Sequence, residues 1–313
     1  MKSRNYAGIS LLASLAACNS ATAETVQKNS TQDPQKPNVI VILADDLGYG
    51  DLKCYGAKNV ETPHVDKLAS EGIRFTNAHT VAATSTPSRY SLLTGEYAWR
   101  RPDTDIAAGD VKMIIRPEQY TMADMFKSAG YATAAIGKWH LGLGDKTGGQ
   151  DWNAPLPAAL GDLGFDYHYI MAATADRVPC VFIENGKVAN YDPSDPIEVS
   201  YTKNFPGEPT GKDNPELLYN LHPSNGHDMS IVNGISRIGF MKGGGKALWK
   251  DENIADSITP FMPSTLSNSI KTSLSLCILQ PMMYTFLVFP MTASVERILW
   301  DYAETQSPNS TGR

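Results

Sequence analysis

Apolar and polar residues follow one another along the chain in blocks that predict alternating strands and helices. Residues 39–44 form a continuous apolar run, typical of a strand buried on both faces of a parallel sheet. A helix is predicted over residues 62–69, with Gly72 just past its end, and a short strand over residues 73–75. The next strand is predicted over residues 131–136. This alternation predicts an α/β fold, a mostly parallel sheet flanked by helices.

Local turn and capping signals add a helix and a hairpin. Thr121-Met122-Ala123-Asp124 is a capping-box sequence, and the helix that it opens is expected to end near Gly130. Asn185-Gly186 separates two short apolar stretches, residues 181–184 and 187–189. We therefore predict a β-hairpin with a tight turn there.

The segment that begins at Ser85 reads Ser-Thr-Pro-Ser-Arg-Tyr-Ser-Leu-Leu-Thr-Gly. Ser85 or Thr86 can cap a helix, Pro87 suits its first turn, and Gly95 can end it. Ser85 and Arg89 would then lie at the positive end of the helix dipole, where a bound anion is favoured. A hydroxyl and a fixed cation at this position indicate a site for an anionic substrate.

Charged side chains follow the predicted strands. Asp45 and Asp46 come directly after the first strand, and Lys138 and His140 come directly after the strand over residues 131–136. Because ligands of open α/β sheets bind beyond the carboxyl ends of the strands, we expect these four side chains to converge. Carboxylate oxygens are the hard ligands that Ca²⁺ and Mg²⁺ prefer.

These motifs together resemble those of the formylglycine-dependent sulfatases, which are members of the alkaline phosphatase superfamily. The pattern Ser-x-Pro-Ser-Arg-x-x-Leu-Leu-Thr-Gly resembles the family signature, with a serine as the residue to be oxidised. Residues 37–51 resemble the opening strand and first metal-ligand pair, and residues 137–142 resemble the Lys/His block. The similarity covers about residues 37–259, which we expect to be the N-terminal part of a sulfatase catalytic domain.

The resemblance implies an activity and a role for each residue. The activity is hydrolysis of sulfate esters, of a sulfated carbohydrate or an aryl alcohol, after a maturation enzyme has converted Ser85 to formylglycine. The cofactor is Ca²⁺, with Mg²⁺ as the alternative. The residues implied are Ser85, Arg89 and His140 for catalysis, Lys138 and His140 for substrate binding, and Asp45, Asp46 and Ser85 for the metal.

Two other functions remain open on the sequence. One is a metal-dependent phosphatase or phosphotransferase of the same superfamily, with Ser85 unmodified. The other is a non-catalytic remnant. A net charge of -6 over 313 residues argues against nonspecific nucleic-acid binding. His168 either lines the substrate pocket or is buried, and Cys54 and Cys180 either pair or stay as thiols.

The N-terminus predicts export. Residues 1–18 combine basic residues, a short apolar region and a Leu-Ala-Ala-Cys sequence that resembles the lipobox of bacterial lipoproteins. We therefore expect lipidation of Cys18 and a location in the periplasm or at the outer membrane, anchored by lipid alone. The alternative is a plain secretory signal cleaved after residues 21–23. Residues 19–36 are polar and predict a flexible tether.

Residues 260–313 do not resemble the family. Their apolar run over residues 274–289 is broken by Gln280 and Pro281 and followed by Pro290, which makes it a poor transmembrane helix. Met282-Met283-Tyr284-Thr285 is encoded ATG ATG TAY ACN. A shift of two nucleotides gives GAT GTA YAC, which reads Asp-Val-His when the Tyr284 codon ends in C. Extended, the shifted frame can give Ala-Thr-Asn-Asp-Val-His-Val-Pro-Arg, which resembles the second metal-ligand block of sulfatases. We therefore predict that a frameshift near Thr259 made this tail, and that the chain is inactive as translated.

Overall fold

The computed structural model describes residues 36–258 and 275–280. The chain divides into the units Met1–Lys36 and Pro37–Arg313, and the fold described below belongs to the second. The predicted signal peptide with Cys18 lies outside the described residues, as does the tether apart from Lys36. The predicted out-of-frame tail also lies outside them, except for one strand.

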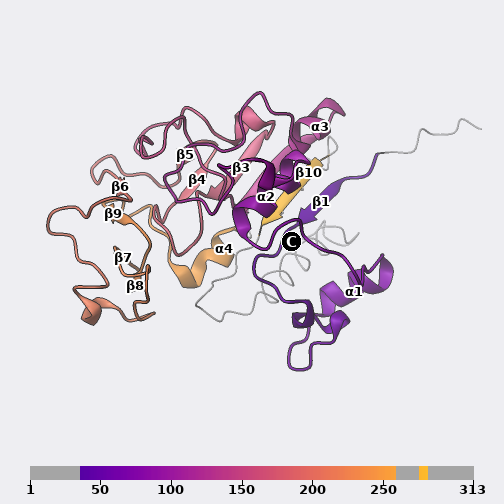
Figure 1. The fold of residues 1–313 in the computed structure, drawn as a ribbon, viewed down its shortest axis with the longest axis horizontal. Helices are drawn as coiled ribbons and strands as arrows, with labels where there is room; N and C mark the ends of the chain where they lie inside the picture. The colour runs from indigo at the N-terminus through magenta and orange to yellow at the C-terminus, as the bar shows by residue number, and fades with distance from the viewer. Residues whose placement is uncertain (1–35, 259–274, 281–313) are drawn as a thin grey trace, which may run out of the picture. The chain divides into compact units, whose positions relative to one another are not determined.

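A six-stranded sheet forms the centre of the fold, in the order β1-β10-β2-β3-β4-β5 (Figure 1). The first four pair in parallel and the last two are antiparallel, which confirms the predicted α/β class. The strands are β1 (Val39–Ile42), β10 (Ser275–Gln280), β2 (Ala132–Lys138), β3 (Tyr167–Met171), β4 (Phe182–Glu184) and β5 (Lys187–Val188).

The two strands predicted from apolar runs are present, with different burial. β2 is buried from its second residue to its end, and Ile136 on it is 1% exposed. β1 is only half-buried along its length, because it forms an edge of the sheet within the described residues. The expectation of burial on both faces was therefore wrong for β1. β10 is a strand, so the transmembrane alternative fails for that part of the tail.

The helices begin and end where local signals act. The α-helices are α1 (Pro63–Glu71), α2 (Ser85–Thr94), α3 (Met122–Ser128) and α4 (Ile254–Ile258), and the 3-10 helices are η1 (Tyr49–Asp51), η2 (Lys53–Tyr55), η3 (Ala98–Arg100), η4 (Leu160–Leu163), η5 (Pro215–Leu217) and η6 (Asp251–Asn253). The capping box at Thr121 is confirmed, since its side chain accepts a hydrogen bond from the Asp124 amide at 3.2 Å. Gly95 ends α2 with φ 70°, a left-handed conformation that glycine adopts without strain.

Two local predictions were wrong. The N-cap of α2 is Thr84, so Ser85 is the first helical residue rather than the cap. Residues 73–75 form no strand: Ile73 is 84% exposed, and no strand of the described chain lies alongside to pair with it. The Phe75 carbonyl instead accepts a hydrogen bond from the Tyr55 hydroxyl at 2.9 Å.

The hairpin predicted at Asn185-Gly186 is confirmed. Both turn residues have positive φ, 46° and 79°, as a tight hairpin turn between β4 and β5 requires. Beyond it the chain is mostly loops with two small antiparallel ribbons that the sequence did not predict. These pair β6 (Glu198–Ser200) with β9 (Phe240–Lys242), and β7 (Ile231–Val232) with β8 (Ile235–Ser236).

Cys54 and Cys180 are both free thiols, which settles the alternative left open by the sequence. Cys180 is fully buried, and burial raises the pKa of its thiol. Over residues 36–258 and 275–280, no helix has both the length and the apolar character needed to cross a membrane.

Candidate active site

Ser85 lies at the start of α2 and takes part in two polar contacts. Its hydroxyl oxygen accepts a hydrogen bond from Arg89 Nε at 2.9 Å, one helical turn further on. The same oxygen lies 3.0 Å from Nδ1 of His140, which follows the end of β2. The sheet therefore brings together the three side chains that the resemblance implied for catalysis.

The imidazole of His140 is neutral and its tautomer is fixed. Burial, reinforced by the nearby charge of Lys138, lowers the pKa of His140 to about 3. Nε2 lies 2.8 Å from the carbonyl oxygen of Ala107, which can only accept, so Nε2 carries the proton. Nδ1 is then a bare acceptor, and the Ser85 hydroxyl donates to it. This arrangement allows His140 to take a proton from an oxygen at the position of Ser85.

Arg89 connects the helix to both strand ends. Its side chain is 1% exposed. Besides Nε, which binds Ser85, Nη1 donates to the Lys138 carbonyl at 2.9 Å, and Nη2 lies 3.2 Å from Asp45 Oδ1. One rigid guanidinium therefore fixes the distance between the Ser85 hydroxyl and the carboxylate that follows β1.

Lys138 and Asp45 form a buried ion pair. Lys138 Nζ donates to Asp45 Oδ2, so both carboxylate oxygens contact a cation. Burial opposes ionisation of Asp45, but Lys138 and Arg89 outweigh it and lower its pKa. Burial, with the nearby charge of Arg89, lowers the Lys138 pKa to about 8. At neutral pH the pair is charged.

Asp46 is exposed at the same strand end and adopts φ 58°. Its charge acts on the neighbouring cation, since it opposes the lowering of the Lys138 pKa. Asp45, Asp46 and the Ser85 hydroxyl are hard oxygen donors, the kind that Ca²⁺ and Mg²⁺ bind. The chemical type of these donors therefore suits such an ion. Ca²⁺ takes six to eight oxygen ligands, more than these three residues supply. Among the described residues, no group of three or more His, Cys, Asp or Glu that could hold a metal is found.

The sequence missed the role of Thr86. This side chain is fully buried; its hydroxyl donates to the His140 carbonyl at 3.0 Å and accepts from the Ala107 amide at 3.1 Å. It therefore ties His140 to the residue that binds the far side of its ring. Only the position of Thr86 beside Ser85 could have drawn attention to it.

His168 lies away from this cluster and is buried, as one of the two alternatives predicted. It is 3% exposed, and its Nε2 accepts a hydrogen bond from the Gly186 amide at 2.8 Å. Burial lowers its pKa to about 4. His168 therefore supports the hairpin turn.

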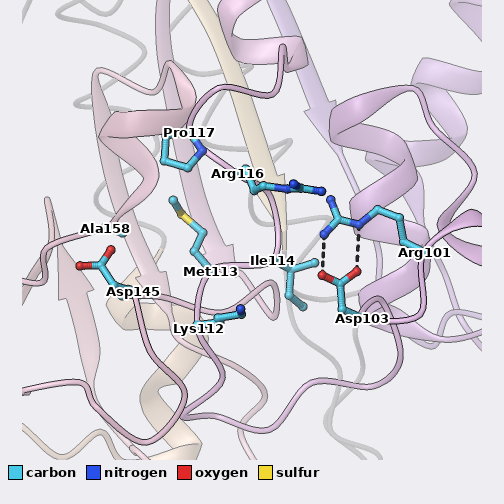
Figure 2. A pocket seen from close by; sticks show the side chains of 10 residues that line it. Arg101, Asp103, Lys112, Met113, Ile114, Arg116, Pro117, Asp145 and Ala158 are labelled. Atoms are coloured by element: carbon cyan, nitrogen blue, oxygen red, sulfur yellow. Dashed lines mark hydrogen bonds and ion pairs between the residues drawn. The ribbon is translucent and has the colours of Figure 1, made fainter.

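A pocket of about 450 Å³ lies near the loop after β2 but excludes the cluster around Ser85 (Figure 2). Arg101 and Asp103 face each other in it through two hydrogen bonds, 2.8 and 2.5 Å long. The other lining residues are Lys112, Met113, Ile114, Arg116, Pro117, Gly144, Asp145 and Ala158. None of the six residues predicted for the site lines it.

Comparison with known proteins agrees with this geometry. A protein-family model described as Sulfatase matches residues 37–220. An N-acetylgalactosamine-6-O-sulfatase of Bacteroides thetaiotaomicron is 56% identical over 248 residues, which is 79% of this chain and 47% of that protein. The steryl-sulfatase of Mus musculus is 48% identical over 119 residues, 35% of this chain and 19% of that protein. The chain thus spans about half the length of the first relative.

Solved structures share the fold. One, from work on the metabolism of multiple glycosaminoglycans by Bacteroides thetaiotaomicron, is 47% identical with a TM-score of 0.82, and the match covers 87% of this chain and 59% of that chain. The crystal structure of Ps i-CgsB is 21% identical with a TM-score of 0.54, covering 87% and 55%. The second likeness concerns the fold alone.

Proposed function

The chain belongs to the sulfatase family, and from this premise we propose that it derives from an enzyme that hydrolyses the sulfate esters of a sulfated carbohydrate. One observation carries the proposal: the Ser85 oxygen is held between the Arg89 guanidinium and the bare Nδ1 of a neutral His140. A group held in this way is positioned to react, and Lys138 beside it suits an anionic ester.

The carbohydrate class rests on the relative that is 56% identical, an N-acetylgalactosamine-6-O-sulfatase. The match covers 47% of that relative. We extend the substrate class of the relative, a sulfated amino sugar, to the full-length protein from which this chain derives. An aryl sulfate serves as the generic substrate, because it carries the same ester without the sugar.

Each residue of the cluster has a role in this proposal. Maturation of Ser85 to formylglycine supplies a hydrated aldehyde as nucleophile. Arg89 orients the reacting oxygen, as it does the Ser85 hydroxyl, and offsets the negative charge that develops on that oxygen during the reaction. His140 accepts a proton at Nδ1, since Nε2 is held as a donor by Ala107. Lys138 neutralises the sulfate oxygens.

Asp45 and Asp46, with the oxygen at position 85, would hold a Ca²⁺ ion or, alternatively, Mg²⁺. When bound, the ion would act as a Lewis acid that polarises the sulfate. Lys138 and Arg89 lower the pKa of Asp45 and so keep it ionised, as a metal ligand must be. We assign the missing ligands to the second metal block, which the out-of-frame hypothesis removes from this chain.

We further propose that the protein is exported and held by lipid on Cys18, and that a formylglycine-generating enzyme matures it. The frameshift near Thr259 remains part of the proposal, and with it the inactivity of the chain as translated. Resequencing the gene across that codon tests it: a single intact frame with no sulfatase-like continuation in the others contradicts the frameshift.

The experiment that tests the function uses mass spectrometry and sulfate release. The chain as translated and the protein with its reading frame restored are each expressed with a formylglycine-generating enzyme. The mass of the peptide that contains Ser85 is then measured. We expect an aldehyde at position 85, and release of sulfate from N-acetylgalactosamine 6-sulfate once the frame is restored. Ser85→Ala should abolish release. Ser88→Ala is the matched control, because within the described part of the chain the Ser88 hydroxyl donates to the Ala82 carbonyl, at 2.6 Å, and not to the cluster around Ser85. An intact serine with hydrolysis of aryl phosphate would instead favour the phosphatase.

A further inference from the structure

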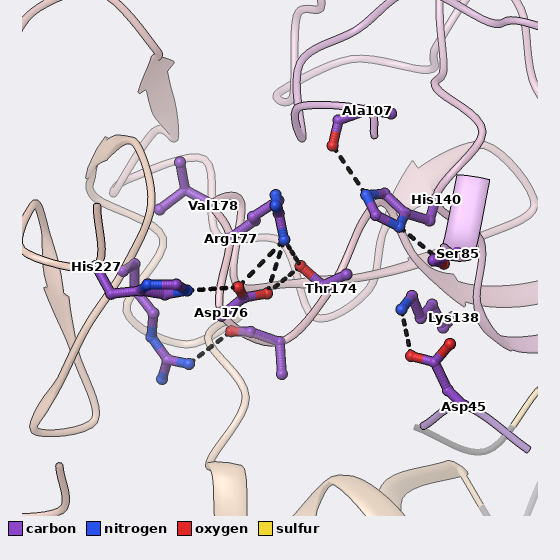
Figure 3. A network of polar contacts seen from close by, with 12 residues as sticks. Asp45, Ser85, Ala107, Lys138, His140, Thr174, Asp176, Arg177, Val178 and His227 are labelled. Carbon is purple, nitrogen blue, oxygen red and sulfur yellow. Dashed lines mark hydrogen bonds and ion pairs between the residues drawn. The ribbon is translucent and has the colours of Figure 1, made fainter. Parts of the chain in front are cut away.

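A second cluster of polar side chains lies next to the catalytic one and takes no part in it (Figure 3). Arg177 Nη1 lies 3.1 Å from each carboxylate oxygen of Asp176, and His227 Nε2 lies 2.9 Å from Asp176 Oδ2. The two clusters are neighbours: His140 N donates to the Ala172 carbonyl at 3.1 Å, and the charge of Arg177 helps to lower the His140 pKa.

The backbone beneath this cluster is fixed from the other side. Ile238 N donates to the Asp176 carbonyl at 2.8 Å, and Val178 N donates to the Ile238 carbonyl at 3.1 Å. The buried side chain of Arg237 donates to the Ala175 carbonyl at 2.6 Å. Asp176 and Arg177 are therefore presented on a rigid loop after β3, as a preorganised binding site requires.

The side chains of this cluster remain accessible, and Arg177 keeps hydrogen-bonding capacity. Arg177, Asp176 and His227 are 18%, 22% and 20% exposed. Every hydrogen bond of the Arg177 guanidinium to the described residues uses Nη1, so Nε and Nη2 have no acceptor there. In Figure 3 the rest of the guanidinium points away from Asp176. The structural ion pair Arg237–Asp251 differs, since its side chains are 1% and 2% exposed and no ligand can reach it.

The chemistry of the cluster suits neutral hydroxyl groups better than a second anion. A sugar hydroxyl both donates and accepts, so a carboxylate can take the proton of one hydroxyl while a guanidinium donates to the oxygen of the next. A second sulfate would meet Asp176. Despite its burial, Arg177, Thr174 and His227 lower the pKa of that carboxyl, and so it stays charged and would repel the sulfate.

We propose that Asp176 and Arg177 bind two neighbouring ring hydroxyls of the sugar whose sulfate group lies at Ser85, while His227 holds the Asp176 carboxylate in position. The cluster makes the enzyme selective for a sulfated sugar over a plain aryl sulfate. This inference rests on the proposed function and specifies which groups of the substrate, the ring hydroxyls, the enzyme recognises.

Binding measurements test the inference without requiring turnover. Dissociation constants of N-acetylgalactosamine 6-sulfate and of nitrophenyl sulfate are measured by calorimetry for the unchanged chain, Asp176→Asn and Arg177→Lys. We expect each variant to weaken sugar binding about tenfold or more, the usual effect of losing a hydrogen bond to a charged group, and to change nitrophenyl sulfate binding less than about twofold. Arg101→Lys is the matched control, because Arg101 is 17% exposed and paired with Asp103 in a different pocket.

A deoxy sugar sharpens the test. The unchanged chain should bind the sugar sulfate less tightly when one recognised ring hydroxyl is replaced by hydrogen, and Asp176→Asn should then add little further loss. Equal weakening of both sulfate esters, or unchanged sugar affinity in folded variants, overturns the inference while leaving the proposed function intact. Failure of the folded, unchanged chain to bind either ester counts against the proposed function itself, and the inference falls with it.

Discussion

The Ser85 hydroxyl lies 3.0 Å from His140 Nδ1, although 55 positions separate the two residues in the chain. Their contact depends on the far side of the imidazole, where Nε2 is held by the Ala107 carbonyl. His140 also adopts φ 59°, an unfavourable conformation for a residue with a side chain, so its neighbours must hold it in place. The orientation of the ring is therefore a property of the whole cluster, and it can be tested one contact at a time.

Thr86→Val should disturb His140 without touching Ser85. It leaves the buried Ala107 amide without its acceptor, at a cost of about 1–3 kcal/mol in the free energy of unfolding. We expect the ¹⁵N signals of His140 to lose their single-tautomer pattern, and kcat of the frame-restored enzyme to fall with little change in KM. Thr86→Ser retains the hydroxyl and should restore both readouts. A rise in KM with kcat unchanged would contradict a positioning role.

Calcium should stabilise the frame-restored protein through Asp45. An ion that binds only the folded state raises its stability by about 2.7 kcal/mol at a concentration of one hundred times Kd. We therefore expect a higher thermal midpoint in calcium, reversed by a chelator, and no such response in Asp45→Asn. Asp103→Asn changes a carboxylate paired with Arg101 outside the site and should keep the response. An equal response in Asp45→Asn would remove Asp45 from the metal site.

His168 should make the fold sensitive to acid. Its pKa is about 4 in the folded chain against an ordinary 6.5, so below 6.5 the unfolded chain takes up a proton that the folded chain does not. Stability is therefore lost as the pH falls, by about 2 kcal/mol between pH 7 and pH 5. His168→Gln keeps an acceptor for the Gly186 amide and should remove that part of the loss in urea unfolding. The same substitution at exposed His79 is the control for the effect of the mutation itself.

Arg237 and Asp251 should behave as a buried ion pair. Two hydrogen bonds join them, at 2.9 and 2.5 Å. Arg237→Met leaves a buried carboxylate without its cation and should lower the free energy of unfolding by about 3–5 kcal/mol, whereas adding Asp251→Leu should recover much of the loss. Lys127→Met breaks an exposed pair with Asp166 and should cost about 0–1 kcal/mol. Equal losses in Arg237→Met and Lys127→Met would contradict this account.

The features that the sequence predicted correctly are those set by nearby residues. The capping box at Thr121, the glycine that ends α2 and the Asn185-Gly186 turn depend on side chains within a few positions. The convergence of Asp45 and Lys138 followed from one topological rule, that parallel strands end at the same edge of a sheet.

What the sequence did not predict depends on contacts between distant segments. Thr86 looked like a helix cap, but its hydroxyl is used by His140 and Ala107. The stretch around Ile73 has strand composition and no strand beside it to pair with among the described residues. The cluster at Arg177 includes His227, which lies in a loop fifty-one residues from Asp176. No local sequence pattern predicts that these two residues are in contact.

The place of β10 in the sheet has a consequence for how the chain assembles. Leu276 is flanked by Val39 on one side and Thr133 on the other, so β1 gains its sheet neighbour only after the last described strand has been synthesised. Until then the backbone groups of β1 that face this partner stay open to other extended chains. Pairing across so long a stretch of sequence also folds slowly. Until β10 pairs with it, the strand that leads to Asp45 is therefore a site at which the newly made protein can aggregate.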